Sequence, residues 1–159
     1  MEHGRLDEAA DNFREAISLK PDFVSAHIGL GTVFEKKRDF LEAAATYERA
    51  IVTTGESGDL FNRLGQVYKE LKQHDRAEYN YRQTIRLQPN HARGHSNLGA
   101  LLVNQRRFQE AISSLEDALR LDSGQTEAAR YLGLAYSELG QSTLALRWFE
   151  RALELNPSM

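Results

Sequence analysis

The sequence predicts an all-α fold, a solenoid built from antiparallel helix-turn-helix hairpins. Three observations indicate it. A Leu-Gly pair recurs about every 34 residues, and an alanine and then a large apolar residue follow each glycine at constant intervals. Between these markers, apolar residues recur at i, i+3, i+4 and i+7, the spacing of an amphipathic helix. Self-similarity at a fixed period of this length is typical of a repeat array.

Four glycines mark the first helix of each repeat: Gly31, Gly65, Gly99 and Gly133. Glycine inside a helix costs about 0.5–1 kcal/mol relative to alanine, so its recurrence implies an offsetting gain in packing. We expect the second helix of each hairpin to approach closely there, with its small alanine meeting the gap. These alanines are Ala43, Ala77, Ala111 and Ala145, and the series extends back to Ala9.

Four places after each alanine stands a large side chain, which we expect to fill the wedge between the two helices of the hairpin. The series is Phe13, Tyr47, Tyr81, Leu115 and Phe149. A proline closes three of the units, and proline stops a helix because its ring blocks continuation. These prolines are Pro21, Pro89 and Pro157.

The pattern assigns the elements in order. First helices are predicted at 24–37, 58–71, 92–105 and 126–139, and their partners at 41–54, 75–88, 109–122 and 143–156. An unpaired second helix is predicted at 5–19. The domain organisation is a truncated first repeat at 1–23 and four full repeats at 24–57, 58–91, 92–125 and 126–159, all in one solenoid domain.

Composition limits the kind of partner. The net charge is −3 and no basic segment stands out, which argues against nucleic acid. No apolar run approaches the roughly 18–20 residues that span a bilayer, so no membrane insertion is expected. The chain has no cysteine, which excludes disulfides and thiolate chemistry and favours a cytoplasmic location.

The pattern Leu-Gly-x-x-Tyr/Phe, followed by Ala-x-x-x-Tyr/Phe-x-x-Ala and proline, resembles the tetratricopeptide repeat (TPR) family over the whole chain. The resemblance implies a right-handed superhelix with a concave groove that binds an extended peptide or a helix of a partner protein. Single units of such arrays are unstable and gain stability by stacking.

The resemblance also assigns the groove, mainly to residues of the first helices near the recurring glycine. The predicted peptide-binding residues are Thr32, Lys36, Asn62, Gln66, Lys69, Arg93, Ser96, Asn97, Ala100, Val103, Asn104, Arg130 and Leu134. Cations and anions nearly balance along this face. Ala100, Val103 and Leu134 are its least polar part, so we expect an apolar side chain of the partner to anchor there. An acidic or carbonyl group is expected near Arg93 and Arg130.

The sequence shows no pattern typical of a catalytic site or a metal site. His91 and His95 are spaced i, i+4, but no third ligand has suitable spacing, so a surface pair is the simpler interpretation. His27 and His95 share one phase of the repeat, which indicates packing. Nothing orders serine, histidine and aspartate as a triad. The chain is therefore predicted to be no enzyme and to carry no cofactor.

Two residues point to contacts at the ends of the array. Phe13 belongs to the unpaired helix, and Trp148 stands where the earlier units have polar residues. The main functional hypothesis is an adaptor or scaffold that binds a protein or peptide in its groove. Two alternatives stay open: a structural array that self-associates through uncapped ends, giving a homo-oligomer, and the non-catalytic targeting segment of a larger enzyme such as a glycosyltransferase.

Overall fold

The computed structural model describes the backbone of residues 2–157 and side chains from Gly4 onward. The described residues form nine α-helices and no strand, which confirms the all-α prediction. The helices are α1 (Glu2–Leu19), α2 (Val24–Lys36), α3 (Phe40–Thr54), α4 (Gly58–Glu70), α5 (His74–Leu87), α6 (Ala92–Asn104), α7 (Phe108–Leu121), α8 (Thr126–Glu138) and α9 (Ser142–Leu155). The predicted repeats at 1–23 and 126–159 include Met1, Ser158 and Met159, which lie outside the described residues.

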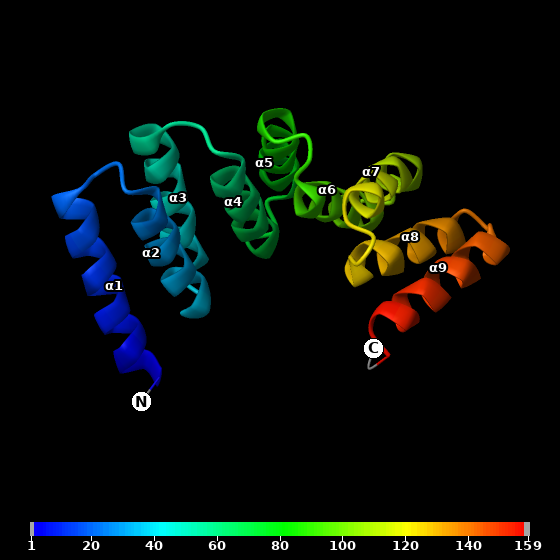
Figure 1. The fold of residues 1–159 in the computed structure, drawn as a ribbon, viewed down its shortest axis with the longest axis horizontal. Coiled ribbons are helices and arrows are strands. Elements are labelled where there is room, and N and C mark those ends of the chain that lie inside the picture. The colour runs from blue at the N-terminus through cyan, green and yellow to red at the C-terminus, as the bar shows by residue number, and fades with distance from the viewer. Residues whose placement is uncertain (1, 158–159) are drawn as a thin grey trace. The chain divides into compact units, whose positions relative to one another are not determined.

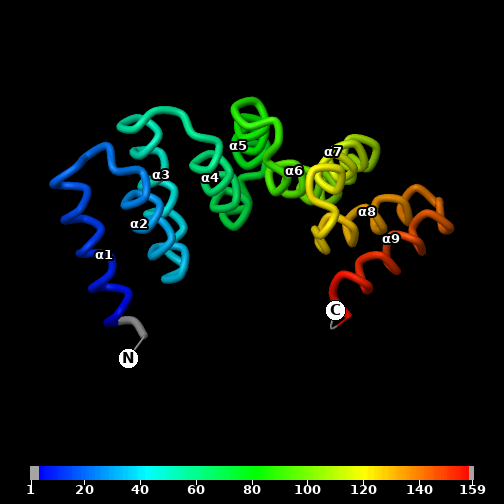
Figure 2. Tube along the Cα trace, viewed as in Figure 1, coloured from blue at the N-terminus to red at the C-terminus, as the bar shows by residue number. Residues whose placement is uncertain are grey.

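The chain divides into two compact units, residues 1–87 and 88–159. In the first unit, each helix packs on the next one along the chain from α1 to α5. In the second unit, α6 packs on α7, α7 on α8 and α8 on α9, and the first helices α6 and α8 also contact each other directly. Figure 1 labels the helices, and the short turns that join them can be followed in Figure 2.

At each recurring glycine, a large side chain of the second helix packs directly against the backbone of the first helix. A Cβ built on Gly31 would lie 2.3 Å from Cε1 of Tyr47, and one on Gly65 would lie 2.6 Å from Cε1 of Tyr81. The same relationship joins Gly99 to Leu115 and Gly133 to Phe149. The atoms nearest each gap therefore belong to the large residue and not to the alanine that we expected there. At Gly99 the backbone oxygen of Ala111 also lies close, 3.3 Å from the added Cβ, but Cγ of Leu115 is nearer at 2.5 Å. A ring or a leucine comes nearest because it is long enough to reach the opposite backbone.

The alanines serve close packing of the second helices instead. Ala43, Ala77 and Ala111 are fully buried, and Ala145 is 4% exposed. Tyr47 and Tyr81 are also fully buried, so both tyrosines and the alanines belong to the core of the first unit. The expectation that the large residues fill this wedge is confirmed.

The turn inside each hairpin uses one residue in the left-handed backbone region. These residues are Arg38, Lys72, Arg106 and Gly140, with φ of 59°, 58°, 63° and 73°. A positive φ costs an L-residue with a side chain roughly 1–2 kcal/mol, whereas glycine adopts it freely. Three hairpins therefore hold a long cationic residue at a strained backbone position.

Candidate functional site

The first unit ties its two full first helices together by a polar network. The hydroxyl of Thr32 donates to the carbonyl oxygen of Ile28 at 2.8 Å and accepts from Nη1 of Arg63 at 3.2 Å. Arg63 also lies 4.0 Å from Glu35 Oε1, and Glu35 accepts a hydrogen bond from the hydroxyl of Tyr47. Burial and then this bond to Glu35 raise the pKa of Tyr47 above its ordinary range. Thr32 and Arg63 are thus hydrogen-bonded to each other within the chain.

The other predicted groove residues of the first unit differ in exposure. Asn62 is buried, with 6% of its surface exposed, and offers little to a ligand. Gln66 is half-buried, and Lys36 and Lys69 are exposed. Lys69 forms an ion pair with the neighbouring Glu70 at 3.5 Å. The first unit therefore presents a face on which most polar groups already have partners inside the chain.

The second unit holds a pocket of about 620 Å³ between the first halves of α6 and α8. It is lined by Asn90, His91, Ala92, Arg93, Ser96, Asn97, Asp122, Gln125, Thr126 and Glu127. The structure thus brings together three of the predicted groove residues, Arg93, Ser96 and Asn97. It surrounds them with residues from the turns that precede the two helices.

Local hydrogen bonds shape both turns. His91 ends the turn before α6, where its Nδ1 accepts from the backbone N–H of Gly94 at 2.8 Å. That bond satisfies one of the donors that every helix leaves free at its N-terminus. In the turn before α8, Oδ1 of Asp122 accepts from the backbone N–H of Gly124 at 3.0 Å. These contacts hold the rim of the pocket in place.

Of two charged side chains that line the pocket, Glu127 has a partner within the chain and Arg93 has none. Glu127 accepts a hydrogen bond from Arg130 at 2.6 Å, and the Arg130 guanidinium lies 4.2 Å from the centre of the Tyr131 ring. The bond to Glu127 is the main cause that raises the pKa of Arg130. Arg93 lines the same pocket, is exposed, and makes no hydrogen bond or ion pair with another described residue. Its guanidinium is available to a ligand.

Two rows of side chains, one on α6 and one on α8, lead away from the pocket and are called the two ridges. On α6, Arg93, Asn97 and Ala100 are spaced i, i+4 and i+7, which places them on one face of the helix. On α8, Glu127 and Leu134 are seven residues apart, on one face. Ala100 and Leu134 are half-buried, so both ridges run from polar to apolar. Asn104 is exposed, but Val103 is only 9% exposed and adds little to the apolar surface that we expected there.

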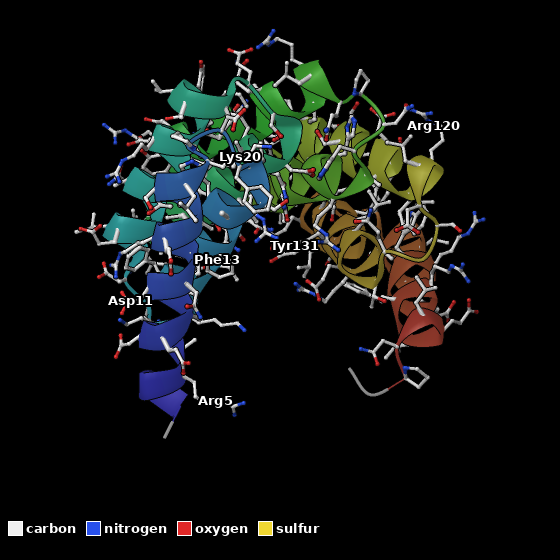
Figure 3. All side chains as sticks on the ribbon, turned by 60° about the vertical axis from the view of Figure 1, so that its left-hand side comes forward. Arg5, Asp11, Phe13, Lys20, Arg120 and Tyr131 are labelled. Carbon is white, nitrogen blue, oxygen red and sulfur yellow. The ribbon has the colours of Figure 1, made fainter. Side chains whose placement is uncertain are left out.

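Of the two predicted end-face residues, Phe13 packs against a neighbouring helix of its own unit. The Phe13 ring of α1, labelled in Figure 3, lies against Gly29 of α2, where an added Cβ would come within 2.3 Å of Cζ. Trp148 is half-buried and lines a shallow depression on α9. The depression is also lined by Arg147, Glu150, Arg151 and Glu154.

The histidines divide into a structural pair and a rim residue. His27 and His95 are buried, and each donates from Nε2 to a proline carbonyl six residues earlier, Pro21 at 2.8 Å and Pro89 at 2.9 Å. Their predicted packing role is confirmed. The interpretation of His91 and His95 as a surface pair is wrong, because His95 lies inside. Among the described residues, no group of three metal-ligating side chains is found.

Sequence reasoning missed several residues of these sites. Arg63 stands 34 residues before Asn97 in the repeat, so its phase marked it as a groove position. Asn90, Asp122 and Gln125 carry no such signal, because they lie in turns and the groove was predicted from first helices alone. The described helices include none with the length and apolarity that a membrane span requires.

Comparison with known proteins agrees with the repeat pattern. A family model described as tetratricopeptide repeat matches residues 1–58, 62–126 and 97–159. The human protein O-mannosyl-transferase TMTC3 is 27% identical, with 96% of this chain and 21% of that protein covered. Superkiller protein 3 of Schizosaccharomyces pombe is 24% identical over 96% of this chain and 11% of its own length. The chain thus spans about a fifth or less of these two relatives.

Solved structures of similar fold include two that cover nearly the whole chain. YrrB, described as a TPR protein with an unusual peptide-binding site, superposes with a TM-score of 0.79 at 26% identity. The match covers 99% of this chain and 81% of YrrB. MamA superposes with a TM-score of 0.85 at 21% identity, covering 98% of this chain and 91% of its own, and at this identity shows the fold alone.

Proposed function

Because the chain belongs to the tetratricopeptide repeat family, whose fold is that of a protein–protein interaction module, we propose that it binds an extended peptide segment of a partner protein at the pocket of its second unit. The observation that carries the proposal is Arg93. This guanidinium lines the pocket and has no partner among the described residues. It is suited to a carboxylate or a main-chain carbonyl of the peptide.

The two ridges define the rest of the ligand. Asn97 lies one turn beyond Arg93, where an amide that donates and accepts can pair with a peptide backbone. Ala100 and Leu134 form the apolar end and fit an aliphatic or aromatic side chain of the partner. The expected ligand therefore carries an acidic residue followed, a few positions along, by an apolar one. The net charge of −3 supports a protein partner over nucleic acid.

The first unit is a weaker candidate for the charged anchor. Its Arg63 is engaged by Thr32 and lies near Glu35, and Lys69 pairs with Glu70. Lys36 is exposed and its side chain has no partner among the described residues, but it lies outside the pocket of the second unit. At Arg63 and Lys69, a ligand would have to replace these contacts before gaining its own. In the second unit, a ligand can bind the Arg93 guanidinium without first breaking a contact inside the chain.

A library of displayed twelve-residue peptides, selected on the purified protein, tests the proposal. We expect enrichment of peptides with an acidic and an apolar residue. Arg93→Gln should weaken a selected peptide about 10-fold, since a hydrogen bond to a charged group contributes about 1.5–3 kcal/mol. The double variant Ala100→Glu with Leu134→Glu should abolish binding with an unchanged far-ultraviolet circular dichroism spectrum.

Arg120→Gln is the matched control, because Arg120 is an exposed arginine of the same unit that pairs with Asp117 on α7, outside the pocket lining. It should leave binding unchanged. Equal binding by the parent and by Arg93→Gln would place the charged anchor elsewhere and contradict the proposal.

A second candidate is that these repeats serve as the non-catalytic binding segment of a larger transferase. The similarity to the O-mannosyl-transferase TMTC3 supports it, with 96% of this chain matched to 21% of that protein. Fusion of the repeats to an unrelated carrier tests this candidate, because a binding segment should still capture the selected peptide and show no transferase activity.

A further inference from the structure

The pocket between α6 and α8 is lined by two opposite charges that do not pair with each other. The guanidinium of Arg93, on α6, has no partner among the described residues. The carboxylate of Asp122, in the turn before α8, accepts one hydrogen bond from the backbone N–H of Gly124 and forms no ion pair with a described residue. A carboxylate has about four acceptor sites, so most of those on Asp122 are open to another donor.

The second carboxylate of the pocket is already engaged. Glu127 accepts from Arg130 at 2.6 Å, and Arg130 lies outside the pocket lining. The charge of Glu127 is therefore balanced inside the chain, whereas Arg93 and Asp122 each depend on solvent or on a ligand for a counter-charge. A ligand in the pocket thus meets one element that carries an unpaired cation and another that carries an unpaired anion.

A buried hydroxyl lines the same pocket. Ser96 on α6 is only 5% exposed, and its side chain has no hydrogen bond with another described residue. A serine or threonine inside a helix can bond to the carbonyl four residues earlier, as Thr32 does to Ile28, but Ser96 does not. A buried hydroxyl without a partner is unfavourable, so its place in a pocket indicates a partner that arrives with the ligand.

We propose that the peptide bound at this pocket carries a cationic group beside its acidic group, so that its carboxylate pairs with Arg93 and its cation with Asp122. This assignment rests on the proposed function, because it adds a second charge to the same ligand. The cation is an ammonium or a guanidinium, from a lysine or arginine side chain or from the α-amino terminus of the peptide. Ser96 stands three residues after Arg93, on the neighbouring turn of α6, so its hydroxyl donates to the same carboxylate.

The geometry of an extended peptide sets the spacing of the two charges. Neighbouring side chains of such a segment point to opposite sides, whereas residues i and i+2 point to the same side, roughly 6–7 Å apart. An acidic and a basic residue spaced i, i+2 therefore both enter one pocket, and an adjacent pair does not.

Ligands with charge of one sign fit this pocket less well. A phosphorylated side chain brings nearly two negative charges, which Arg93 would have to balance while Asp122 repels them. A purely basic segment would leave Arg93 without a partner and would be repelled by it. A segment with one charge of each sign gives both side chains a partner.

Selection of displayed twelve-residue peptides on the parent and on Asp122→Asn tests the proposal. Asparagine keeps an oxygen that accepts from Gly124, so the substitution removes the charge and preserves the turn. Peptides selected on the parent should carry a basic residue two places from the acidic one. On Asp122→Asn the basic residue should disappear and the acidic residue should remain, and on Arg93→Gln the reverse should hold. Asp22→Asn, at an exposed and unpaired aspartate in the turn before α2, is the matched control and should select the same peptides as the parent.

The outcomes of this selection separate the second charge from the proposed function. Acidic peptides enriched on the parent without a basic residue would overturn the second charge and leave the proposed function standing. A selection that enriches no acidic peptide would contradict both.

The affinity of one selected peptide, synthesised with both ends blocked, measures the contribution of the second charge. Asp122→Asn in the protein and glutamine for the basic residue in the peptide should each weaken binding about 2- to 5-fold, and the two changes together should weaken it no further. If blocking the amino terminus alone causes this loss, the cation is the α-amino group. Equal binding by the parent and Asp122→Asn, or tighter binding when phosphoserine replaces the acidic residue, would overturn the proposal.

Ser96→Ala separates a role in binding from a role in the fold. The hydroxyl has no partner inside the described chain, so the melting temperature of the free protein should stay the same or rise. The affinity for the selected peptide should fall about 2- to 10-fold. A lower melting temperature with unchanged affinity would show that the hydroxyl serves the fold and would contradict its part in the site.

Discussion

The ring of Tyr47 occupies the space in which a side chain at Gly31 would begin. A Cβ at Gly31 would lie 2.3 Å from Cε1 and 2.4 Å from Cζ of that ring, well inside van der Waals contact. Tyr47 is fully buried and its hydroxyl is bonded to Glu35, so the ring has little freedom to move aside. The helix of Gly31 and the helix of Tyr47 can pack this closely only because position 31 has no side chain.

Gly31→Ala should therefore lower the free energy of unfolding by about 1–3 kcal/mol through overpacking. Gly4→Ala is the matched control, because a Cβ at Gly4 in α1 meets nothing within 4 Å. That control should be neutral or stabilise by up to about 1 kcal/mol through helix propensity. Urea denaturation of both variants measures the difference. Equal midpoints for Gly31→Ala and the parent would contradict the close-packing argument.

Tyr47 and Tyr81 should respond oppositely to loss of the hydroxyl. Both are fully buried, but Tyr47 donates to Glu35, whereas the hydroxyl of Tyr81 has no hydrogen-bond partner among the described residues. Tyr47→Phe should destabilise by about 1–3 kcal/mol, and Tyr81→Phe should be neutral or stabilising, because it removes an unsatisfied polar group. Thermal melts of the two variants test this, and a strong loss for Tyr81→Phe would show that its hydroxyl is bonded after all.

Stability should fall at alkaline pH. Burial is the largest cause that raises the pKa of Tyr47 and of Tyr81 above the ordinary value of 10.0. The folded state then keeps the phenolic protons that the unfolded state releases. The tyrosine contribution is complete below about pH 10 and is lost as the pH rises through the folded pKa. Melting temperatures between pH 8 and pH 11 should decline at the upper end, and less steeply in Tyr81→Phe.

Lys72→Gly should stabilise the second hairpin of the first unit. Lys72 has a φ of 58° and is exposed, and its side chain makes no hydrogen bond or ion pair with another described residue. Relief of roughly 1–2 kcal/mol of backbone strain outweighs the added entropy of the unfolded chain, for a net gain of about 0.5–1 kcal/mol. Lys72→Ala is the control, since alanine keeps the strain. In urea denaturation, Lys72→Gly should be more stable than Lys72→Ala. If Lys72→Ala were the more stable variant, backbone strain at position 72 would not explain the result.

The sequence by itself determined the architecture. The recurring Leu-Gly pair and the alanine series predicted the helices to within a few residues at each end, because helix boundaries depend on local patterns of apolar residues, prolines and glycines. It also placed His27 and His95 in one structural role, since equal phase in a repeat means equal surroundings on the backbone.

Only the tertiary structure decided which groups remain free to bind. Asn62 and Val103 were predicted to line a groove and are buried, while Arg63 is engaged by a threonine 31 residues away. Arg93 and Asp122 at the pocket are left without ion-pair partners inside the described chain. The physical reason is that a repeat fixes the backbone position of each side chain but not the identity of its neighbours. Those neighbours come from other helices and from turns, where the repeat varies most.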